Sequence, residues 1–311
     1  MNTFYARMTG KLLGDGCITR EPNRQPRFHY THHVPDLAWT TQCYDELKSY
    51  IPIHEPIYRK VTDERLIKGY SENYFVRSRV HPIITKLYDI WYPNGTRIVP
   101  RTFVRRYFNA EALAWWYQDD GHLKIENGQV RKIILSTESF TKEENEWLIE
   151  LLYDTFQLQF RRDKANRILL YDQFQCFVFL HIVEPYMNDC MERKKNPHLP
   201  AKPFAQKPAI RLPLTIQLTK PTAQLNAALE RLDYFFDEEH VNMERIMQQF
   251  LPRSFTTEPK KHVQVRLTND NRKCLLALRK ATGLTLSELS TWCFRSVEHI
   301  QERQQLYKFS S

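Results

Sequence analysis

Two acidic residues occupy matching places in the sequence, each after an apolar stretch and directly before a glycine. Residues 8–16 read MTGKLLGDG and residues 113–121 read LAWWYQDDG, which places Asp15 and Asp120 105 positions apart (120 − 15). If the fold brought these side chains together, their carboxylates would repel each other unless cations lay between them. Mg²⁺ prefers oxygen ligands and retains waters and substrate phosphates, so it suits such a pair. The two acids therefore predict metal-assisted hydrolysis of a phosphodiester.

Both stretches have the spacing of short helices. Apolar residues recur at helical intervals in 8–16, and Asn109 is a suitable N-cap for a helix that runs into the second stretch. We predict that Gly16 ends the first helix in a left-handed conformation and that Gly121 ends the second. Small residues at positions 9, 10, 14 and 114 would let the two helices pack side by side, with both acids near a pseudo-twofold axis.

A similar series of elements follows each motif. Residue alternation and helical spacing predict strands at 26–33, 56–61, 73–78, 130–139 and 166–172, and helices at 40–51 and 142–156. The order helix, strands, helix, strands, helix thus occurs twice in about two hundred residues. This order indicates an internal duplication.

The amino-acid composition of the chain favours one class of binding partner. The chain has 45 Lys and Arg against 36 Asp and Glu, a formal charge of +9, which favours a nucleic-acid partner. Its six cysteines are dispersed without a CxxC pair, which argues against a disulfide framework or a structural zinc site. The sequence shows neither a signal-peptide pattern nor the roughly 18 apolar residues of a membrane span, so a soluble, intracellular protein is expected.

The two motifs resemble the signature motifs of single-chain LAGLIDADG homing endonucleases, and the second resembles the intron-encoded branch most closely. The resemblance extends to TRIVPRTFVRRYFNAEALAWWYQDDG (96–121), STESFTKEENEWLIELLYDTFQLQF (136–160) and VEPYMNDCMERKKNP (183–197), and it covers roughly residues 1–200. It implies an α+β fold with two pseudo-symmetric αββαββα repeats at 1–101 and 102–196. Their strands would form an antiparallel saddle in the major groove of DNA.

The same resemblance implies an activity and its residues. It implies a monomeric, Mg²⁺- or Mn²⁺-dependent endonuclease that makes a staggered double-strand cut at a long DNA site. Residue by residue, Asp15 and Asp120 become the metal-binding catalytic pair. Arg97 in TRIVP and Lys194 in MERKK become the basic residues beside the metals.

Two further residues complete the predicted metal site, and two depart from the family pattern. The site includes Gly14 and Asp119, although adjacent helix positions point about 100° apart, so Asp119 is expected to tune the site without direct ligation. Lys11 and Trp115 stand where the family usually has apolar or small residues. Because the first motif is degenerate, a second interpretation of the function stays open. In this interpretation the protein is an inactive DNA-binding regulator, or a maturase with intron RNA as its partner.

The polar residues of the predicted strands are expected to face DNA. Arginine and other polar side chains on such a face can read base edges or contact phosphates. In the first repeat the candidates are Arg24, Arg27, His29, Thr31, Arg59, Arg77 and Arg79; in the second they are Lys132, Ser136, Arg161, Arg162 and Arg167. The adjacent His32 and His33 should face opposite ways on a strand, so one of them is expected to contact a base or a phosphate.

The last third of the chain contains a second repeat. A basic, Pro-rich segment at 197–213 reads as an extended linker, and residues 216–232 then align with residues 265–281 at an offset of 49. Each copy is predicted to form a strand, a helix and a second helix. The second helix is expected near 239–251 in the first copy and near 285–302 in the later copy.

The later copy, at 262–300, resembles a ribbon-helix-helix DNA-binding unit, in which paired strands enter the major groove. The resemblance implies a tandem pair within 214–311. The expected base-facing residues are Thr215, Gln217, Thr219, Gln264, Arg266 and Thr268. A helical appendage that stabilises the N-terminal repeats is the alternative.

Overall fold

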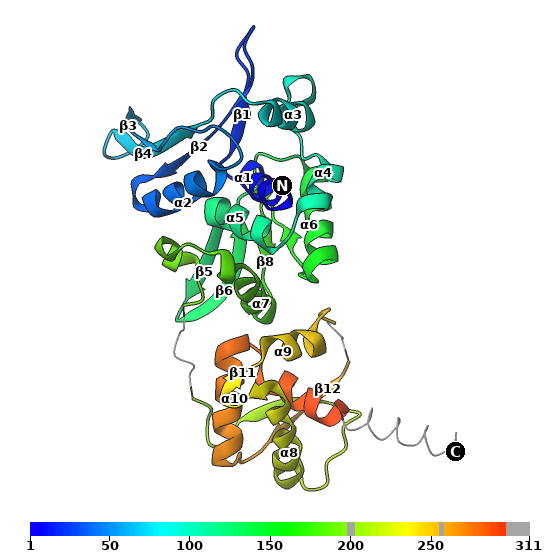
Figure 1. The fold of residues 1–311 in the computed structure, drawn as a ribbon. Coiled ribbons are helices and arrows are strands. Elements are labelled where there is room, and N and C mark those ends of the chain that lie inside the picture. The colour runs from blue at the N-terminus through cyan, green and yellow to red at the C-terminus, as the bar shows by residue number, and fades with distance from the viewer. Residues whose placement is uncertain (198–202, 255–257, 297–311) are drawn as a thin grey trace, which may run out of the picture. The chain divides into compact units, whose positions relative to one another are not determined.

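The computed structural model describes residues 1–197, 203–254 and 258–296 of the 311-residue chain (Figure 1). The chain divides into two compact units. The N-terminal unit comprises residues 1–126, 130–171 and 179–197, and the C-terminal unit comprises residues 127–129, 172–178 and the chain from 198 onward. No helix among the described residues is both long and apolar enough to cross a bilayer.

The two motif helices, α1 (Asn2–Leu13) and α5 (Ala110–Asp120), pack side by side as predicted (Figure 1). Asn109 caps α5, because its side chain accepts a hydrogen bond from the backbone N of Ala112 at 2.9 Å. A Cβ atom on Gly10 would lie 2.4 Å from the carbonyl oxygen of Ala112. Glycine at this position therefore allows the close helix approach that the sequence predicted.

Gly121 ends α5 as predicted, whereas Gly16 does not form the left-handed cap predicted for the first helix. Gly14 caps α1 with φ −99°, Gly121 caps α5 with φ −84°, and Gly16 is not among the residues with positive φ. A Cβ on Gly16 would lie 2.6 Å from the carbonyl oxygen of Lys11, and one on Gly121 would lie 1.9 Å from the ring of Tyr117. These glycines are required for close approach and not for a left-handed cap.

The first repeat contains a four-stranded antiparallel sheet in the order β1-β2-β4-β3. Its strands are β1 (Cys17–Thr19), β2 (Arg27–His33), β3 (Ile57–Thr62) and β4 (Tyr70–Arg77), and its further helices are η1 (Val34–Asp36), α2 (Leu37–Leu47), α3 (Pro82–Trp91) and η2 (Pro93–Gly95). The predicted strands at 26–33, 56–61 and 73–78 match β2, β3 and β4. The αββαββα pattern implied a first strand and a final helix, which are β1 and α3, although no residue range was predicted for either.

The second repeat has the same sheet order, β5-β6-β8-β7, which confirms the internal duplication. Helix α4 (Arg101–Tyr107) precedes α5. The remaining elements are β5 (Gly121–Glu126), β6 (Gln129–Leu135), α6 (Lys142–Phe156), β7 (Arg161–Arg162), β8 (Ile168–Leu170), α7 (Gln173–Val183), η3 (Glu184–Tyr186) and η4 (Asp189–Lys194). The predicted helix at 142–156 coincides with α6, whose start Thr141 and Glu144 fix through a capping box.

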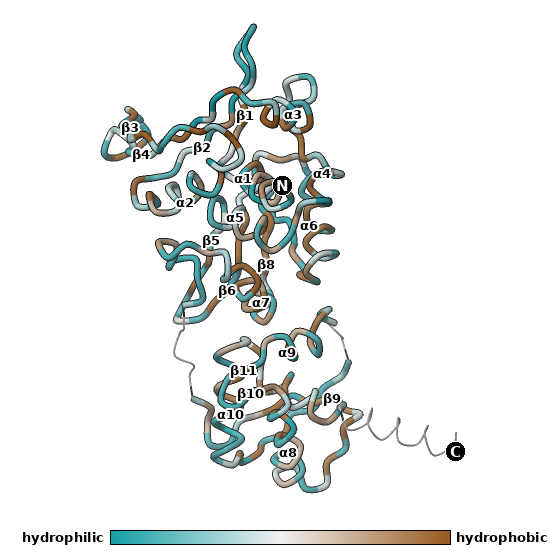
Figure 2. The backbone as a smooth tube through the Cα atoms, viewed as in Figure 1, coloured by the Kyte–Doolittle hydropathy of each residue, from teal (hydrophilic) through white to brown (hydrophobic). Residues whose placement is uncertain are grey.

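Aromatic residues fill the core between the repeats. Trp115, Trp116 and Tyr117 of α5 are at most 2% exposed. Trp39 of α2 lies edge-on to Trp115, with ring centroids 5.1 Å apart. In Figure 2, β8 and α7 are among the brown, hydrophobic segments.

The C-terminal unit contains two copies of a strand followed by helices. The first copy has β9 (Ala209–Pro213), α8 (Pro221–Leu229), η5 (Glu230–Phe235), a small hairpin of β10 (Phe236–Asp237) and β11 (His240–Val241), and α9 (Met243–Phe250). The second has β12 (Lys260–Gln264), α10 (Asn269–Thr282) and helical residues 286–296. The remainder of the helix predicted at 285–302 lies outside the described residues.

Strands β9 and β12 pair as an antiparallel ribbon, in which Leu212 faces Lys261. These two residues are 49 positions apart (261 − 212), so at this one pair the ribbon joins two positions that are equivalent under the sequence repeat. The predicted strand positions are wrong, however. Gln217 lies after β9 and its Nε2 donates to the carbonyl of Leu214, while Thr268 caps α10. Part of the predicted linker thus forms β9, and its residues 198–202 lie outside the described residues.

Candidate active site

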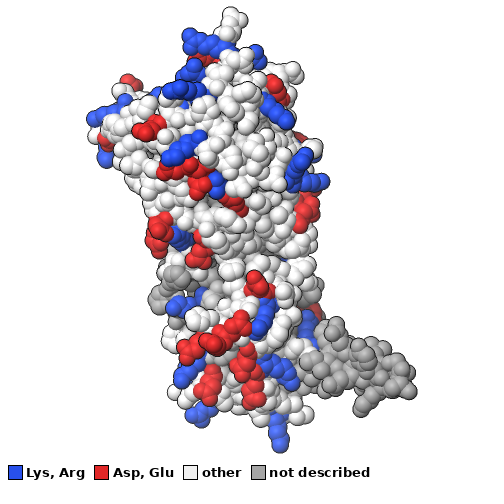
Figure 3. Space-filling model, viewed as in Figure 1, with Lys and Arg blue, Asp and Glu red and all other residues white. Residues whose placement is uncertain are grey.

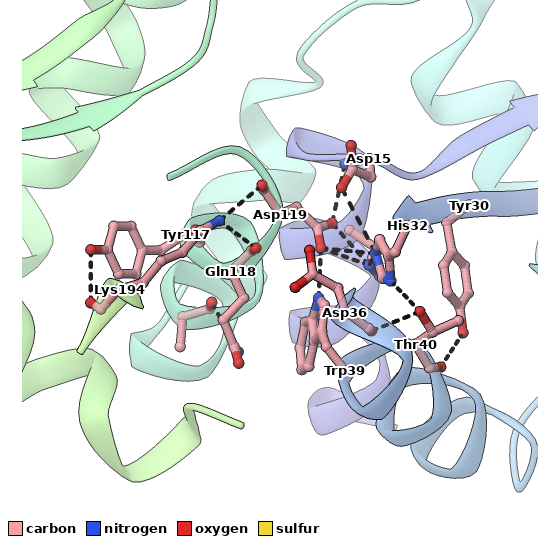
Figure 4. A network of polar contacts seen from close by, with 12 residues as sticks. Asp15, Tyr30, His32, Asp36, Trp39, Thr40, Tyr117, Gln118, Asp119 and Lys194 are labelled. Carbon is pink, nitrogen blue, oxygen red and sulfur yellow. Dashed lines mark hydrogen bonds and ion pairs between the residues drawn. The ribbon is translucent and has the colours of Figure 1, made fainter. Parts of the chain in front are cut away.

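Asp15 and Asp120 lie at corresponding ends of the two motif helices. Asp120 is the last residue of α5, and Asp15 follows the C-cap of α1. Asp120 is among the charges that raise the pKa of Asp15, which is consistent with the juxtaposition that the sequence predicted. Figure 4 shows Asp15 beside Asp119 at the helix ends.

Both acids are held in an environment that opposes their ionisation. Desolvation by the surrounding chain, followed by repulsion from Asp119, raises the pKa of Asp15 to about 8, while 38% of its side chain stays exposed. The same two causes raise the pKa of Asp120 to about 7, against attraction from Lys194 and Arg97. Desolvation is the larger cause of both shifts, and the repulsion from Asp119 adds to it.

Asp119 turns across the helix interface into a buried network (Figure 4). Its carboxylate and the ammonium group of Lys11 are both 0% exposed and form an ion pair, with Nζ 2.7 Å from Oδ1 and 3.0 Å from Oδ2. Trp39 Nε1 donates to Oδ1 at 2.9 Å, and the backbone N of Asp15 donates to Oδ2 at 3.1 Å. Burial acts to raise the pKa of Asp119, but the charge of Lys11 opposes it and the pKa is lowered.

His32 extends this network toward α2. Its Nε2 lies 2.7 Å from Lys11 Nζ, and its Nδ1 lies 2.9 Å from the hydroxyl of Thr40. The Thr40 hydroxyl donates to the carbonyl of Asp36 at 3.0 Å, so it accepts from Nδ1–H and leaves Nε2 to accept from Lys11. Burial, and then the charge of Lys11, lowers the pKa of His32, in agreement with a neutral ring.

Asp15, His32 and Asp119 could together hold a metal ion, because one ligand atom from each lies within 4.8 Å of the others. Lys11 Nζ already contacts both His32 and Asp119 at 2.7 Å. The cation that neutralises Asp119 is therefore an ammonium group from the first motif. Asp119 accordingly orients Asp15 through its backbone, while its own oxygens are already occupied by donors.

Lys194 and Arg97 each bind the carboxyl end of one motif helix. Lys194 Nζ donates to the carbonyls of residues 117, 118 and 119, at 3.2, 2.6 and 3.1 Å. Arg97 donates to the carbonyl of Leu12 near the end of α1. The last carbonyls of a helix lack backbone partners and carry partial negative charge, so a cation is favourable at each end. Burial lowers the pKa of Lys194 to about 8, against attraction from Asp119.

Gly14 fits this arrangement because it has no side chain. A Cβ at this position would lie 2.6 Å from the Cβ of Asp119 and 2.8 Å from its Oδ2. Glycine therefore leaves the space through which Asp119 reaches Lys11. The structure gives Gly14 this steric role.

Most of the predicted DNA-facing residues of the first repeat share one face of the sheet. His29 pairs with Arg77 and Thr31 with Phe75, and residues paired across strands project to the same side. The register and the alternation along β2 add Arg27 and Arg59 to this face. Phe28, Tyr30 and His32 point to the opposite, buried face, so of the histidine pair His33 is the outward residue.

The remaining candidates of the first repeat lie beside that face. Arg24 is in the β1–β2 turn and its Nη1 lies 2.7 Å from Glu21, and Arg79 is exposed after β4. On the side of the molecule in Figure 3, Lys and Arg side chains gather over the region of β1, β3 and β4.

The candidates of the second repeat divide between two faces. Lys132 and Arg161 lie on the face that includes Leu169, and the backbone N of Ser136 donates to the carbonyl of Asp120 at 3.0 Å. Arg162 lies on the other face, where its Nη2 is 3.7 Å from Glu146 of α6. Arg167 forms an ion pair with Asp163 at 2.7 Å within the β7–β8 turn.

In the C-terminal unit, the residues that are exposed on the β9–β12 ribbon differ from the base-facing residues predicted from the sequence. Gln264 is exposed at the end of β12, and Arg266 is exposed beyond it. The pairs Arg211–His262 and Ala209–Gln264 project to one side of the ribbon, and all four residues are exposed. The side chains of Ile210 and Leu212 are buried on the other side.

Sequence reasoning noted Lys11 as a departure but did not predict its partners. The ion pair joins residues 108 positions apart, and Trp39 comes from a third element. A lysine inside an otherwise apolar motif helix was the signal, because a buried ammonium group requires an acid nearby.

Comparison with known proteins agrees with this fold. The LAGLIDADG DNA endonuclease family matches residues 6–173, and the chain belongs to this family. An uncharacterized protein of Methanocaldococcus jannaschii is 30% identical over 186 residues, which are 57% of this chain and 67% of that protein. A probable intron-encoded endonuclease of Wickerhamomyces canadensis is 24% identical over 200 residues, which are 60% of this chain and 81% of the relative.

A solved structure supports the architecture. The homing endonuclease I-WcaI, bound to its DNA recognition sequence, superposes with a TM-score of 0.55 and 22% identity. The match covers 62% of this chain and 86% of the other. At this level of identity the comparison shows the shared fold.

Proposed function

We propose that this protein is a site-specific DNA endonuclease that hydrolyses both strands with divalent metal ions held by Asp15 and Asp120. The observation that carries the proposal is the pairing of these acids at matching helix ends, each beside a basic residue that binds its helix. The raised pKa values of both acids are compatible with it, because a bound divalent cation would favour the ionised form of each carboxyl group over the protonated one.

The donor set fits Mg²⁺ or Mn²⁺. Two carboxylates near one another are the oxygen ligands that such hard cations take, with the remaining positions left to waters and DNA phosphates. When bound, the ions would activate water and stabilise the leaving oxygen of the phosphodiester. Asp119 and Lys11 would position Asp15, and Lys194 and Arg97 would supply positive charge beside the phosphate.

The sheet faces supply the proposed DNA contacts. Arg27, His29, Thr31, Arg59 and Arg77 share one face of the first sheet, and Lys132 and Arg161 share one face of the second. Polar side chains on such faces can contact base edges and phosphates in the major groove. A monomer would present both sheets to one duplex, in line with the relative whose structure is bound to DNA.

The proposed C-terminal contribution is a second contact with duplex DNA through the β9–β12 ribbon. Its pair Leu212–Lys261 joins equivalent positions of the sequence duplication, as expected where two ribbon-helix-helix copies pair about a pseudo-twofold axis. The exposed residues Arg211, His262 and Gln264 replace Gln217 and Thr268 as the proposed base-facing residues.

The decisive experiment is cleavage of a duplex made by joining the two DNA flanks of the reading frame with the presumed insertion removed. With Mg²⁺ the natural chain should make one discrete double-strand cut, while Asp15→Asn and Asp120→Asn should bind this duplex but not cut it. Tight binding by the natural chain without cleavage would favour the inactive regulator or the intron-RNA maturase. Cleavage that survives both substitutions would contradict the metal assignment.

A further inference from the structure

The C-terminal unit contains a groove that shares only Arg211 with the proposed duplex-binding residues Arg211, His262 and Gln264. Its volume is about 1470 Å³, and its walls come from the ribbon, η5, the chain after α9 and the helical residues 286–296. Pockets for small molecules usually measure roughly 300–1,000 Å³, so the groove suits a more extended ligand.

An aromatic surface lies in this groove. The rings of Tyr234 and Trp292 are stacked, with centroids 6.0 Å apart and planes 20° apart, and Tyr234 is 46% exposed. Phe235 supports Trp292 from the core at 4.4 Å, and Trp292 Nε1 donates to Gln249 at 3.1 Å. The Arg245 guanidinium lies over the Tyr234 ring, 5.5 Å from its centroid. Because these contacts hold the rings in place, the exposed part of Tyr234 and this guanidinium form an ordered surface on which a base can stack.

Five cationic side chains line the groove, against three carboxylates. Arg253 forms ion pairs with Asp172 and Glu288. Arg295 forms an ion pair with Glu258. The charges of these two arginines are therefore already balanced within the protein. The other cations are Arg211, Arg231 and Lys260. They are exposed, and within the described parts of the chain no carboxylate forms an ion pair with them.

We propose that this groove binds single-stranded nucleic acid, with a base stacked on Tyr234 and Trp292 and phosphates bound by Arg211, Arg231 and Lys260. A row of cations next to exposed aromatic rings is the combination that binds single strands without strong sequence preference. Bases of a duplex are already stacked on their neighbours, so they cannot cover an aromatic ring without leaving the helix. This binding site is separate from Asp15 and Asp120 and does not depend on DNA cleavage.

The test uses the full chain in EDTA, with fluorescein-labelled 12-mers of oligo-uridine and oligo-thymidine and a non-target 12-base-pair duplex. Fluorescence anisotropy gives the Kd of each over a range of salt. Tyr234→Ala should weaken binding of the single strands at least fivefold, whereas Tyr234→Phe should retain their affinity. Arg231→Gln should weaken single-strand binding and reduce its salt slope by about 0.7, the value for one phosphate contact. Tyr234 and Arg231 lie outside the β9–β12 ribbon, so substitutions at these positions should change duplex affinity by less than twofold.

Lys273→Gln is the matched control, since it removes one exposed cation from α10 that does not line the groove. It should leave single-strand affinity unchanged, and thermal unfolding of every variant verifies its fold. Unchanged single-strand affinity in both groove variants would overturn the proposal, as would equal losses for single strands and duplex. The two labelled oligonucleotides decide whether RNA or DNA is the preferred strand.

Discussion

Lys11 replaces an apolar residue of the motif with a wholly buried charge. Its ammonium group neutralises Asp119, and Asp119 in turn accepts a hydrogen bond from the backbone of Asp15. The departure from the family pattern is thus compensated within the helix interface. Both repeats contribute to this compensation, because Lys11 belongs to α1 and Asp119 to α5.

We predict that Lys11→Met destabilises the protein by about 3–5 kcal/mol, because it leaves the Asp119 carboxylate buried without its cation. Urea unfolding followed by circular dichroism measures this loss. The double variant Lys11→Met/Asp119→Asn should recover part of it, since the uncompensated charge is then absent. A double variant as unstable as the sum of the two single variants would show that the pair is not coupled.

The raised pKa values of Asp15 and Asp120 predict how pH affects the metal-free protein. In the unfolded chain an aspartate has a pKa of about 3.9, whereas folding raises the pKa of Asp120 to about 7. The folded state therefore binds more protons between these values, and its stability falls as pH rises through that window. Asp120→Asn should thus be more stable than the natural chain at pH 8 in EDTA, with no difference below about pH 4.

Melting temperatures measured across this range in EDTA test that prediction. Metal binding has the complementary dependence, because the carboxylates must lose their protons to bind a cation. Added Mg²⁺ should raise the melting temperature of the natural chain more at pH 8 than at pH 6. An equal increase at both values would argue that the raised pKa values do not control binding.

At the level of elements, the packing of α1 against α5 determines the geometry of the site. The two helices approach closely because Gly10 and Gly14 have no side chains at the contact. Arg97 and Lys194 then bind the carboxyl ends of the two helices, one in each repeat. The pseudo-symmetry of the sequence is therefore repeated in the contacts around the acids.

Gly10→Ala is expected to force the helices apart, because its Cβ would lie 2.4 Å from a backbone oxygen and 2.6 Å from Trp115. Overpacking of this kind costs about 1–3 kcal/mol, more than the gain of up to about 1 kcal/mol in helix propensity. Thermal unfolding should show a net loss. Thr3→Ala, at an exposed position of the same helix, is the control and should change stability by less than about 0.5 kcal/mol.

For the whole molecule, the proposed C-terminal contact should add to the DNA affinity of the N-terminal unit. Two binding elements on one chain act together, since the second binds at a high effective concentration. Deletion of residues 205–311 should therefore weaken duplex binding and flatten its dependence on salt. Anisotropy titrations at several salt concentrations measure both quantities. An unchanged salt slope in a folded truncated chain would leave the C-terminal residues as a stabilising appendage.

Short-range patterns in the sequence were sufficient for much of the fold. The paired motifs, the strand and helix order, and the helix at 142–156 depend on periodicity and caps within about fifteen residues. The close packing of the motif helices followed from small residues at known positions. The two acids were predicted in the same way, because each lies at the end of a recognisable helix.

Other features depended on contacts between distant segments. The partners of Lys11, the inward orientation of His32 and the steric role of Gly14 all require the packing of α1, α2 and α5. In the C-terminal unit, short strands have weak local signals, so their position at 209–213 and 260–264 is set by pairing across the ribbon. The sequence by itself determined which residues could carry the chemistry. The tertiary structure decided which buried charges neutralise one another, because the energy of a buried charge depends on its neighbours in space.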